Sequence, residues 1–182
     1  MLLAACSPFE GDLIRLRARE PEDEQEVFRW MSDPDVVLWN LVRYPRSRAS
    51  VRERIAAGAD VGYAHARFAI ETIAESKLIG DIAVHVEEPE SRCGWIAVTL
   101  GDPDYRDKGY GSDAVRTVCR FGFEMMNLRR IEVEVLGENE RAIRTYEKVG
   151  FVHEGRRRQA VYTHGRYIDL IVMGLLREDF PE

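Results

Sequence analysis

Residues 106–112, Arg-Asp-Lys-Gly-Tyr-Gly-Ser, are the stretch that decides how this chain is expected to fold. They follow an apolar run at residues 94–100, Gly-Trp-Ile-Ala-Val-Thr-Leu, and open an amphipathic segment. A basic, glycine-bearing turn between a strand and a helix is typical of phosphate binding, because glycine allows close backbone approach and the helix N-terminus attracts anions. The order lacks the third glycine of a dinucleotide fingerprint and the Gly-Lys-Ser/Thr end of a P-loop. Taken alone, such a motif is more often a plain turn with a helix cap.

The composition predicts one globular domain. The chain has 182 residues, of which 45% are hydrophobic and 32% charged, enough for one sizeable core. We expect a short extension at residues 1–10 and a single domain at residues 11–182. The formal charge of −6 argues against general affinity for nucleic acid or anionic membranes and is compatible with a cationic substrate.

The cysteine pattern predicts a cytoplasmic protein without a metal site. Cys6, Cys93 and Cys119 are few, odd in number and not at metal-ligand spacing, which suggests a reducing compartment; Cys119 is expected in the core. Residues 3–6, Leu-Ala-Ala-Cys, resemble a lipoprotein cleavage box. A charged leader and a long apolar run are missing, so we expect no lipidation. No apolar run reaches the length of about 18 residues that a membrane span needs.

Hydrophobic periodicity predicts seven strands and four helices. Strands are expected at residues 13–17, 65–71, 78–86, 93–100, 131–135, 151–162 (as pieces at 151–155 and 160–162) and 167–176. Helices are expected from Pro21 to about residues 32–34, from a Ser50–Glu53 capping box to Gly58, at residues 112–127, and at residues 140–149 with Gly150 as a left-handed terminator. A strand–helix–strand crossover implies one parallel pair. The fold class is therefore α/β (α+β), with a mixed, mostly antiparallel sheet and helices packed on it.

Two loops at the carboxyl ends of strands are the expected ligand site. They are residues 101–111 and residues 136–139, and each precedes a predicted helix. Ligands of open α/β sheets bind at such strand ends, where neighbouring strands diverge. We therefore expect one site that uses both loops.

Two motifs resemble the GCN5-related N-acetyltransferase (GNAT) superfamily. Residues 94–111 are similar to its acetyl-CoA-binding core, and residues 139–151, Asn-Glu-Arg-Ala-Ile-Arg-Thr-Tyr-Glu-Lys-Val-Gly-Phe, resemble its second signature. The resemblance covers roughly residues 11–178. Residues 30–41 and 154–179 are most similar to the ribosomal-protein N-terminal acetyltransferase branch, which also contains enzymes for polyamines and antibiotics. The resemblance implies acetyl-CoA as co-substrate, direct acetyl transfer to a primary amine, and a possible homodimer.

The resemblance also implies roles for individual residues. Leu100 and Gly101 offer backbone groups to the pantetheine arm, Asn139 bonds the cofactor, and Tyr146 faces the thioester sulfur. Asp107 stands where the family often has glycine, so its side chain must point to solvent. The pyrophosphate is expected on the amides of Arg106, Lys108, Gly109, Tyr110, Gly111 and Ser112, with Arg106 and Lys108 adding charge.

Direct amine attack on a thioester needs positioning, oxyanion donors and proton transfer. Tyr146 can protonate the leaving sulfur; its alternative role is core packing. The general base stays open among His85, Glu87, Glu134 and a water relay.

The acceptor is equally open. A protein N-terminus, a polyamine and an aminoglycoside all remain, without nucleic acid or membrane partners. Trp39 and Tyr44 either shape the acceptor pocket or pack under a loop.

Two rival functions and one basic run complete the predictions. A non-catalytic acyl-CoA-binding module keeps the fold without turnover, although it needs no proton donor at Tyr146. A nucleotide-phosphate binder is disfavoured by the missing fingerprint residues. Arg156, Arg157 and Arg158 are expected to form a solvated or salt-bridged strand edge.

Overall fold

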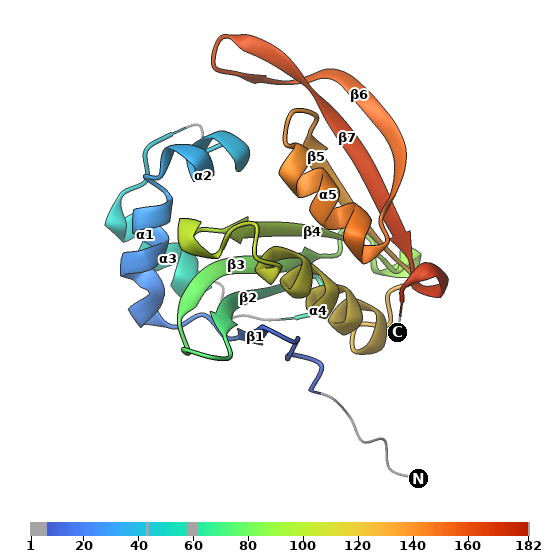
Figure 1. Cartoon of the computed structure of the whole chain (residues 1–182), viewed down its shortest axis with the longest axis horizontal. Coiled ribbons are helices and arrows are strands. Elements are labelled where there is room, and N and C mark those ends of the chain that lie inside the picture. The colour runs from blue at the N-terminus through green and yellow to red at the C-terminus, as the bar shows by residue number, and fades with distance from the viewer. Residues whose placement is uncertain (1–6, 43, 58–61, 182) are drawn as a thin grey trace.

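The computed structural model describes residues 7–42, 44–57 and 62–181, and they form a seven-stranded sheet with helices packed on it (Figure 1). The predicted lipoprotein-like segment at residues 3–6 and the predicted helix end at Gly58 lie outside these ranges. The strands are β1 (Ile14–Arg17), β2 (His65–Thr72), β3 (Leu78–His85), β4 (Cys93–Leu100), β5 (Arg130–Leu136), β6 (Val152–Thr163) and β7 (Arg166–Leu176). The α-helices are α1 (Glu24–Trp30), α2 (Pro34–Trp39), α3 (Arg48–Ala57), α4 (Tyr110–Glu124) and α5 (Glu140–Val149). Short 3-10 turns are η1 (Pro21–Asp23), η2 (Pro89–Ser91), η3 (Pro103–Tyr105) and η4 (Arg177–Asp179).

The strand order confirms the predicted mixed sheet. It runs β1-β2-β3-β4-β5-β7-β6, and every neighbouring pair is antiparallel except β4 with β5. The parallel pair arises because α4 connects β4 to β5 as a crossover. Consequently the two predicted ligand loops start at adjacent strand ends.

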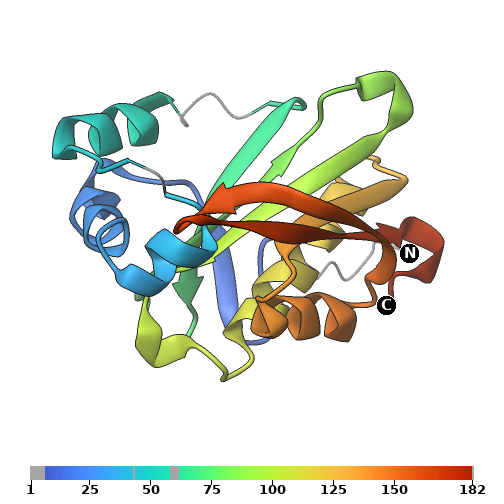
Figure 2. The same cartoon turned by 90° about the horizontal axis from the view of Figure 1, so that it is seen from above.

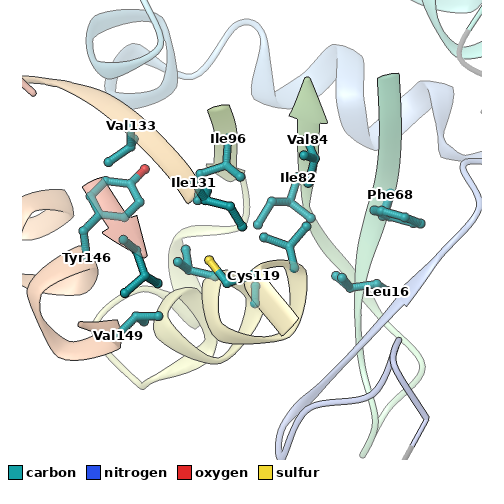
Figure 3. Close-up of a cluster of buried hydrophobic side chains, with 14 of the residues drawn as sticks. Leu16, Phe68, Ile82, Val84, Ile96, Cys119, Ile131, Val133, Tyr146 and Val149 are labelled. Atoms are coloured by element: carbon teal, nitrogen blue, oxygen red, sulfur yellow. The ribbon is translucent and has the colours of Figure 1, made fainter. Parts of the chain in front are cut away.

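The main core lies between the sheet and helices α4 and α5. Val115, Val118 and Cys119 on α4 are fully buried, as is Val149 on α5. Figure 3 shows Cys119 among the apolar side chains of the strands, which confirms its expected core position. Gly150 ends α5 in the left-handed conformation with φ 108°, as its sequence position predicted.

The other face of the sheet is more polar, because successive residues of a strand point to opposite faces. Cross-strand partners on this face include His65, His85 and Trp95, followed by Glu132 on β5. Helices α1–α3 gather at one end of the sheet (Figures 1 and 2) around Trp30, Val51 and other apolar residues. The β6–β7 hairpin reaches toward α2, where Trp39 packs against a small apolar cluster that includes Val161 and Ile168.

The structure corrects the prediction that residues 33–34 only end a helix. Asp33 instead caps a further helix, α2, by accepting from the amides of Asp35 and Val36, with Pro34 in the first turn. Proline fits the first turn of a helix because its missing N–H has no partner there. The sequence therefore predicted four helices where five are present among the described residues.

Other boundaries also differ. The Ser50–Glu53 capping box was wrong, because α3 begins at Arg48 and Ser47 accepts from the amide of Ser50. Helix α4 begins two residues before and ends three residues before the predicted 112–127. The two strand-like pieces at 151–155 and 160–162 are parts of one strand, β6, whose register shifts twice.

Candidate active site

A gap in the sheet creates the site. The β4–β5 ladder comprises Cys93↔Arg130, Gly94↔Ile131 and Trp95↔Glu132, and β4 continues for five more residues without this pairing. A cavity of about 850 Å³ lies there, lined by residues of β4, β5, α2 and α5 and by the N-terminal part of α4. The cavity is therefore at the strand ends where the sequence predicted a ligand.

The N-terminus of α4 offers main-chain donors to this cavity. Gly109 is its N-cap with φ 93°, a left-handed conformation that favours glycine. Gly109, Gly111 and Ser112 line the cavity. No side chain caps the helix, so its first amides remain available to an anion, which the helix dipole also favours.

Helix α5 brings two predicted residues to the cavity. Asn139 caps the helix by accepting from the amide of Ala142 at 3.1 Å, which leaves its amide N–H₂ free to donate. Tyr146 is 5% exposed, packs edge-on against Phe151 with ring centroids 5.5 Å apart, and lines the cavity. Burial raises the pKa of Tyr146, so the phenol is protonated at neutral pH. Figure 3 shows its hydroxyl pointing to the side where Val133 lies.

At the end of β4, Gly101 and Arg106 make contacts that the sequence did not predict. Gly101 donates its amide to Ile79, and Trp30 occupies the space beside its α-carbon. Arg106 donates to the carbonyls of Leu100 and Gly101 at 3.3 and 3.2 Å. It also pairs with Asp35 at 2.9 Å and Asp33 at 3.5 Å. Its guanidinium thus holds the strand end and α2, whereas we had expected it to add free charge at the pyrophosphate.

The predicted residues therefore divide into two groups. Lys108 is exposed and Tyr110 packs edge-on against Tyr105, and neither side chain lines the cavity; nor does Gly101. Asp107 is exposed and also lines the cavity. The residues that do line the cavity are Leu100, Arg106, Gly109, Gly111, Ser112, Asn139 and Tyr146.

The candidate general bases also differ in position. Glu87 and Glu134 line the cavity. Glu87 accepts from the indole N–H of Trp95 at 3.3 Å, and Glu134 pairs with Arg157. His85 is not a lining residue; its ring stacks on Trp95 with centroids 4.0 Å apart. Burial, with smaller effects from His65 and Arg67, lowers the pKa of His85 to about 4.

The two aromatic residues that were expected near the acceptor also differ in whether they line the cavity. Trp39 lines the cavity, whereas Tyr44 is 76% exposed and does not. The basic run on β6 is salt-bridged as predicted: Arg156 pairs with Asp169 and Arg157 with Glu134.

Sequence reasoning missed two sets of lining residues. Arg141, Arg144 and Lys148 line the cavity from α5, and their spacing of three and four residues indicates one helix face. Trp95 and Glu132 line it from the polar face. Trp95 and Glu132 lie opposite each other because β4 pairs with β5. This pairing joins segments that are distant in sequence, so no local pattern predicted it.

Comparisons with known proteins identify the class of this fold and site. Residues 14–152 match the model of the acetyltransferase (GNAT) domain. The SPbeta prophage-derived uncharacterized N-acetyltransferase YokL of Bacillus subtilis is 29% identical over 178 residues, 97% of each chain. The B. subtilis protein named "Putative ribosomal N-acetyltransferase YdaF" is 25% identical over 172 residues, 92% of this chain and 93% of that one.

Two further similar proteins are an enzyme with a named substrate and a solved structure. The spermidine N(1)-acetyltransferase of Vibrio cholerae is 28% identical over 117 residues, 64% of this chain and 66% of that one. A GNAT acetyltransferase structure from Bacillus anthracis superposes with a TM-score of 0.82 at 25% identity, covering 93% of this chain and 98% of that one.

The chain belongs to the GNAT acetyltransferase family. It is an N-acetyltransferase that moves an acetyl group from acetyl-CoA, its co-substrate, to an amine. The resemblance to the family is confirmed, and the chain is similar to a relative named as a putative ribosomal N-acetyltransferase. Among the described residues, no helix has the length and apolar character to cross a lipid bilayer.

Proposed function

We propose that this enzyme acetylates a small cationic amine, which enters from the polar face of the sheet while acetyl-CoA lies against α4 and α5. The observation that carries this proposal is the cavity between β4 and β5, which has amides and basic side chains at α4 and α5 and carboxylates on the strands. A thioester and an amine that meet in this gap are held close for direct transfer.

The cofactor half is supported by complementary charge. The first amides of α4 and the free amide group of Asn139 are donors for a pyrophosphate and a pantetheine carbonyl. Arg141 and Lys148 add positive charge on the same side. We propose that Lys108 and Tyr110 contribute through their main chain alone, and that Arg106 is a positioning residue for the strand end.

The catalytic step assigned to Tyr146 follows from its protonation state. When the amine attacks the thioester carbon, the C–N bond forms, the C–S bond breaks, and the thiolate needs a proton. We propose that the Tyr146 hydroxyl donates it or a hydrogen bond as the charge develops. The amine proton passes to Glu87, Glu134 or water.

The acceptor half is supported by Glu87, Glu132 and Glu134 with the indoles of Trp39 and Trp95. Glu132 and Glu134 are partly neutralised by Arg130 and Arg157, whereas Glu87 has no cationic partner among the described residues. A carboxylate beside an indole suits an ammonium group, through charge and cation–π attraction. A polyamine of the kind named in the Vibrio cholerae relative has this chemistry.

The test is a thiol-release assay with acetyl-CoA and three acceptors: spermidine, a neutral peptide with a free N-terminus, and an aminoglycoside. We expect the highest kcat/KM with spermidine. In Glu87→Gln, KM for spermidine should rise about tenfold with kcat retained, because about 1.4 kcal/mol of binding is lost.

Glu90→Gln is the matched control, because Glu90 is an exposed glutamate of the neighbouring η2 turn that does not line the cavity. A fall in kcat at unchanged KM in Glu87→Gln would instead make Glu87 the general base. Faster turnover of the peptide than of spermidine would overturn the polyamine proposal.

Homodimer formation and a cytoplasmic location stay predictions. Light scattering of the purified protein measures the first, and fractionation of its host cells the second.

A further inference from the structure

Four arginines lie near one another outside the active-site cavity, and one carboxylate lies beside at least two of them. Arg19 follows β1, Arg46 lies between α2 and α3, Arg54 is on α3, and Arg67 is on β2; the carboxylate is Asp81 on β3. A second, small cavity of about 10 Å³ lies among them, lined by Arg19, Arg46, Arg54 and Asp81 together with Val27, Met31 and Val51.

This arginine cluster is short of acceptors. Nη1 of Arg19 and Nε of Arg67 are buried and have no hydrogen-bond partner in the part of the chain that the structure describes. Asp23 also acts on Arg19, but the Asp23 carboxylate is bound by both terminal nitrogens of Arg17. Burial and the neighbouring guanidiniums Arg67 and Arg46 lower the pKa of Arg54, and burial likewise lowers that of Arg19.

The unpaired guanidinium nitrogens of the arginine cluster have the capacity to donate to an anion. A buried cationic nitrogen is costly unless it is paired, and an unsatisfied one marks an absent ion or water. Among the described residues that line this cavity, Asp81 supplies the one carboxylate, and its two oxygens face several guanidiniums. The small cavity itself holds about one water. Arg46 and Arg54 are exposed on its outer side, so their long side chains can rearrange to admit a larger ligand.

We propose that the arginine cluster binds a free oxyanion of the phosphate class. Several guanidinium forks can each bind two oxygens of one tetrahedral anion, which a single carboxylate cannot supply. Because Arg46 belongs to the segment that follows α2, the anion would tie this segment to β2 and β3.

The proposed site is separate from the active-site cavity. Arg67 pairs with Ala83, which pairs with Ala97, and Ala97 lines the active-site cavity. Two strand spacings, about 10 Å, therefore separate the cluster from the acceptor side of that cavity. An anion there would hold the α2–α3 connection beside the acceptor side without contacting acetyl-CoA.

The test is a thermal-unfolding titration with inorganic phosphate in saturating CoA, at constant ionic strength maintained with chloride. The CoA fills the pyrophosphate site, so the remaining shift reports another site. We expect a saturable rise in Tm of about 5 °C at a hundredfold excess over Kd, with one phosphate bound per chain by calorimetry.

Arg46→Gln and Arg54→Gln should each weaken phosphate binding about tenfold or more. Both residues are exposed, so the variants should fold even if Arg19 or Arg67 variants do not. Arg52→Gln is the matched control, because Arg52 is an exposed arginine of the same helix that pairs with Glu24 outside the cluster. The proposal is overturned if phosphate gives no saturable rise beyond chloride, or if Arg46→Gln and Arg54→Gln respond to phosphate as Arg52→Gln does.

Discussion

The indole of Trp30 occupies the space in which a side chain at Gly101 would have to lie. A Cβ atom built on Gly101 would be 2.0 Å from Cδ2 of Trp30, far inside van der Waals contact. Trp30 ends α1 and Gly101 follows β4, so this contact sets how closely the α1–α3 helices approach the end of β4.

Gly101→Ala should therefore destabilise the protein by about 3 kcal/mol, because the rigid, buried indole must move to admit the methyl group. Urea unfolding measures the change. Gly155→Ala is the control, since a Cβ at Gly155 meets nothing within 4 Å. Equal unfolding midpoints for the two variants would contradict the proposed packing role.

Tyr146→Phe should lower kcat about a hundredfold or more and leave CoA affinity and stability nearly unchanged. The hydroxyl has no hydrogen-bond partner among the described residues, so the lost term is proton donation to the thiolate. A thiol-release assay measures kcat, and a titration with CoA measures the affinity. Tyr162→Phe, on the exposed hairpin, serves as control, and wild-type turnover in Tyr146→Phe would remove Tyr146 from the mechanism.

Asp113→Asn should cost about 2 kcal/mol of unfolding free energy. The Asp113 carboxylate on α4 accepts from the amides of Asp12, Leu13 and Ile14 at 3.1, 2.8 and 3.1 Å. An asparagine turns one acceptor into a donor that faces these N–H groups and leaves buried amides unpaired. Chemical denaturation measures the loss. Asp12→Asn, an exposed neighbour, should stay near wild type; a similar loss there would contradict this account.

Stability should fall as the pH drops from about 6.5 toward 4, in part because of His85. Its folded pKa of about 4 lies below the ordinary value of 6.5, so in this window the unfolded chain binds more protons. Above pH 7 the contribution is fully present. Since His85 is partly solvent-screened, we expect about 1 kcal/mol.

His85→Phe retains a ring over Trp95 and should flatten this pH dependence, as urea unfolding at a series of pH values would show. Some slope should remain, because burial and Arg67 also lower the pKa of His65. His164→Gln, in an exposed turn, should keep the wild-type profile. An unchanged slope in His85→Phe would exclude His85 as its source.

Local signals explain why much of the fold could be predicted. Strand β4 and helix α5 have the predicted bounds, because alternation, an Asn cap and a terminal glycine each act within a few residues. Helix α2 was missed because Asp33-Pro34 fits both a helix end and a helix start.

Long-range contacts account for the errors at the site. Arg106 reaches Asp35, 71 residues away, and no periodicity encodes that pairing. The role of Gly101 likewise depends on a tryptophan in another helix. The arginine cluster joins four segments that are separate in sequence. The motif thus located a loop that lines the cavity, while the contacts of its side chains depend on the tertiary fold.

The short ladder between β4 and β5 also leaves each of these strands with an unpaired edge. In the described chain the two strands pair with each other only over Cys93–Trp95 and Arg130–Glu132. On their outer sides β4 stays paired with β3 as far as Leu100, and β5 with β7 as far as Leu136. A ligand in the gap therefore meets main-chain N–H and C=O groups of two strand edges, which can donate and accept hydrogen bonds without any side chain.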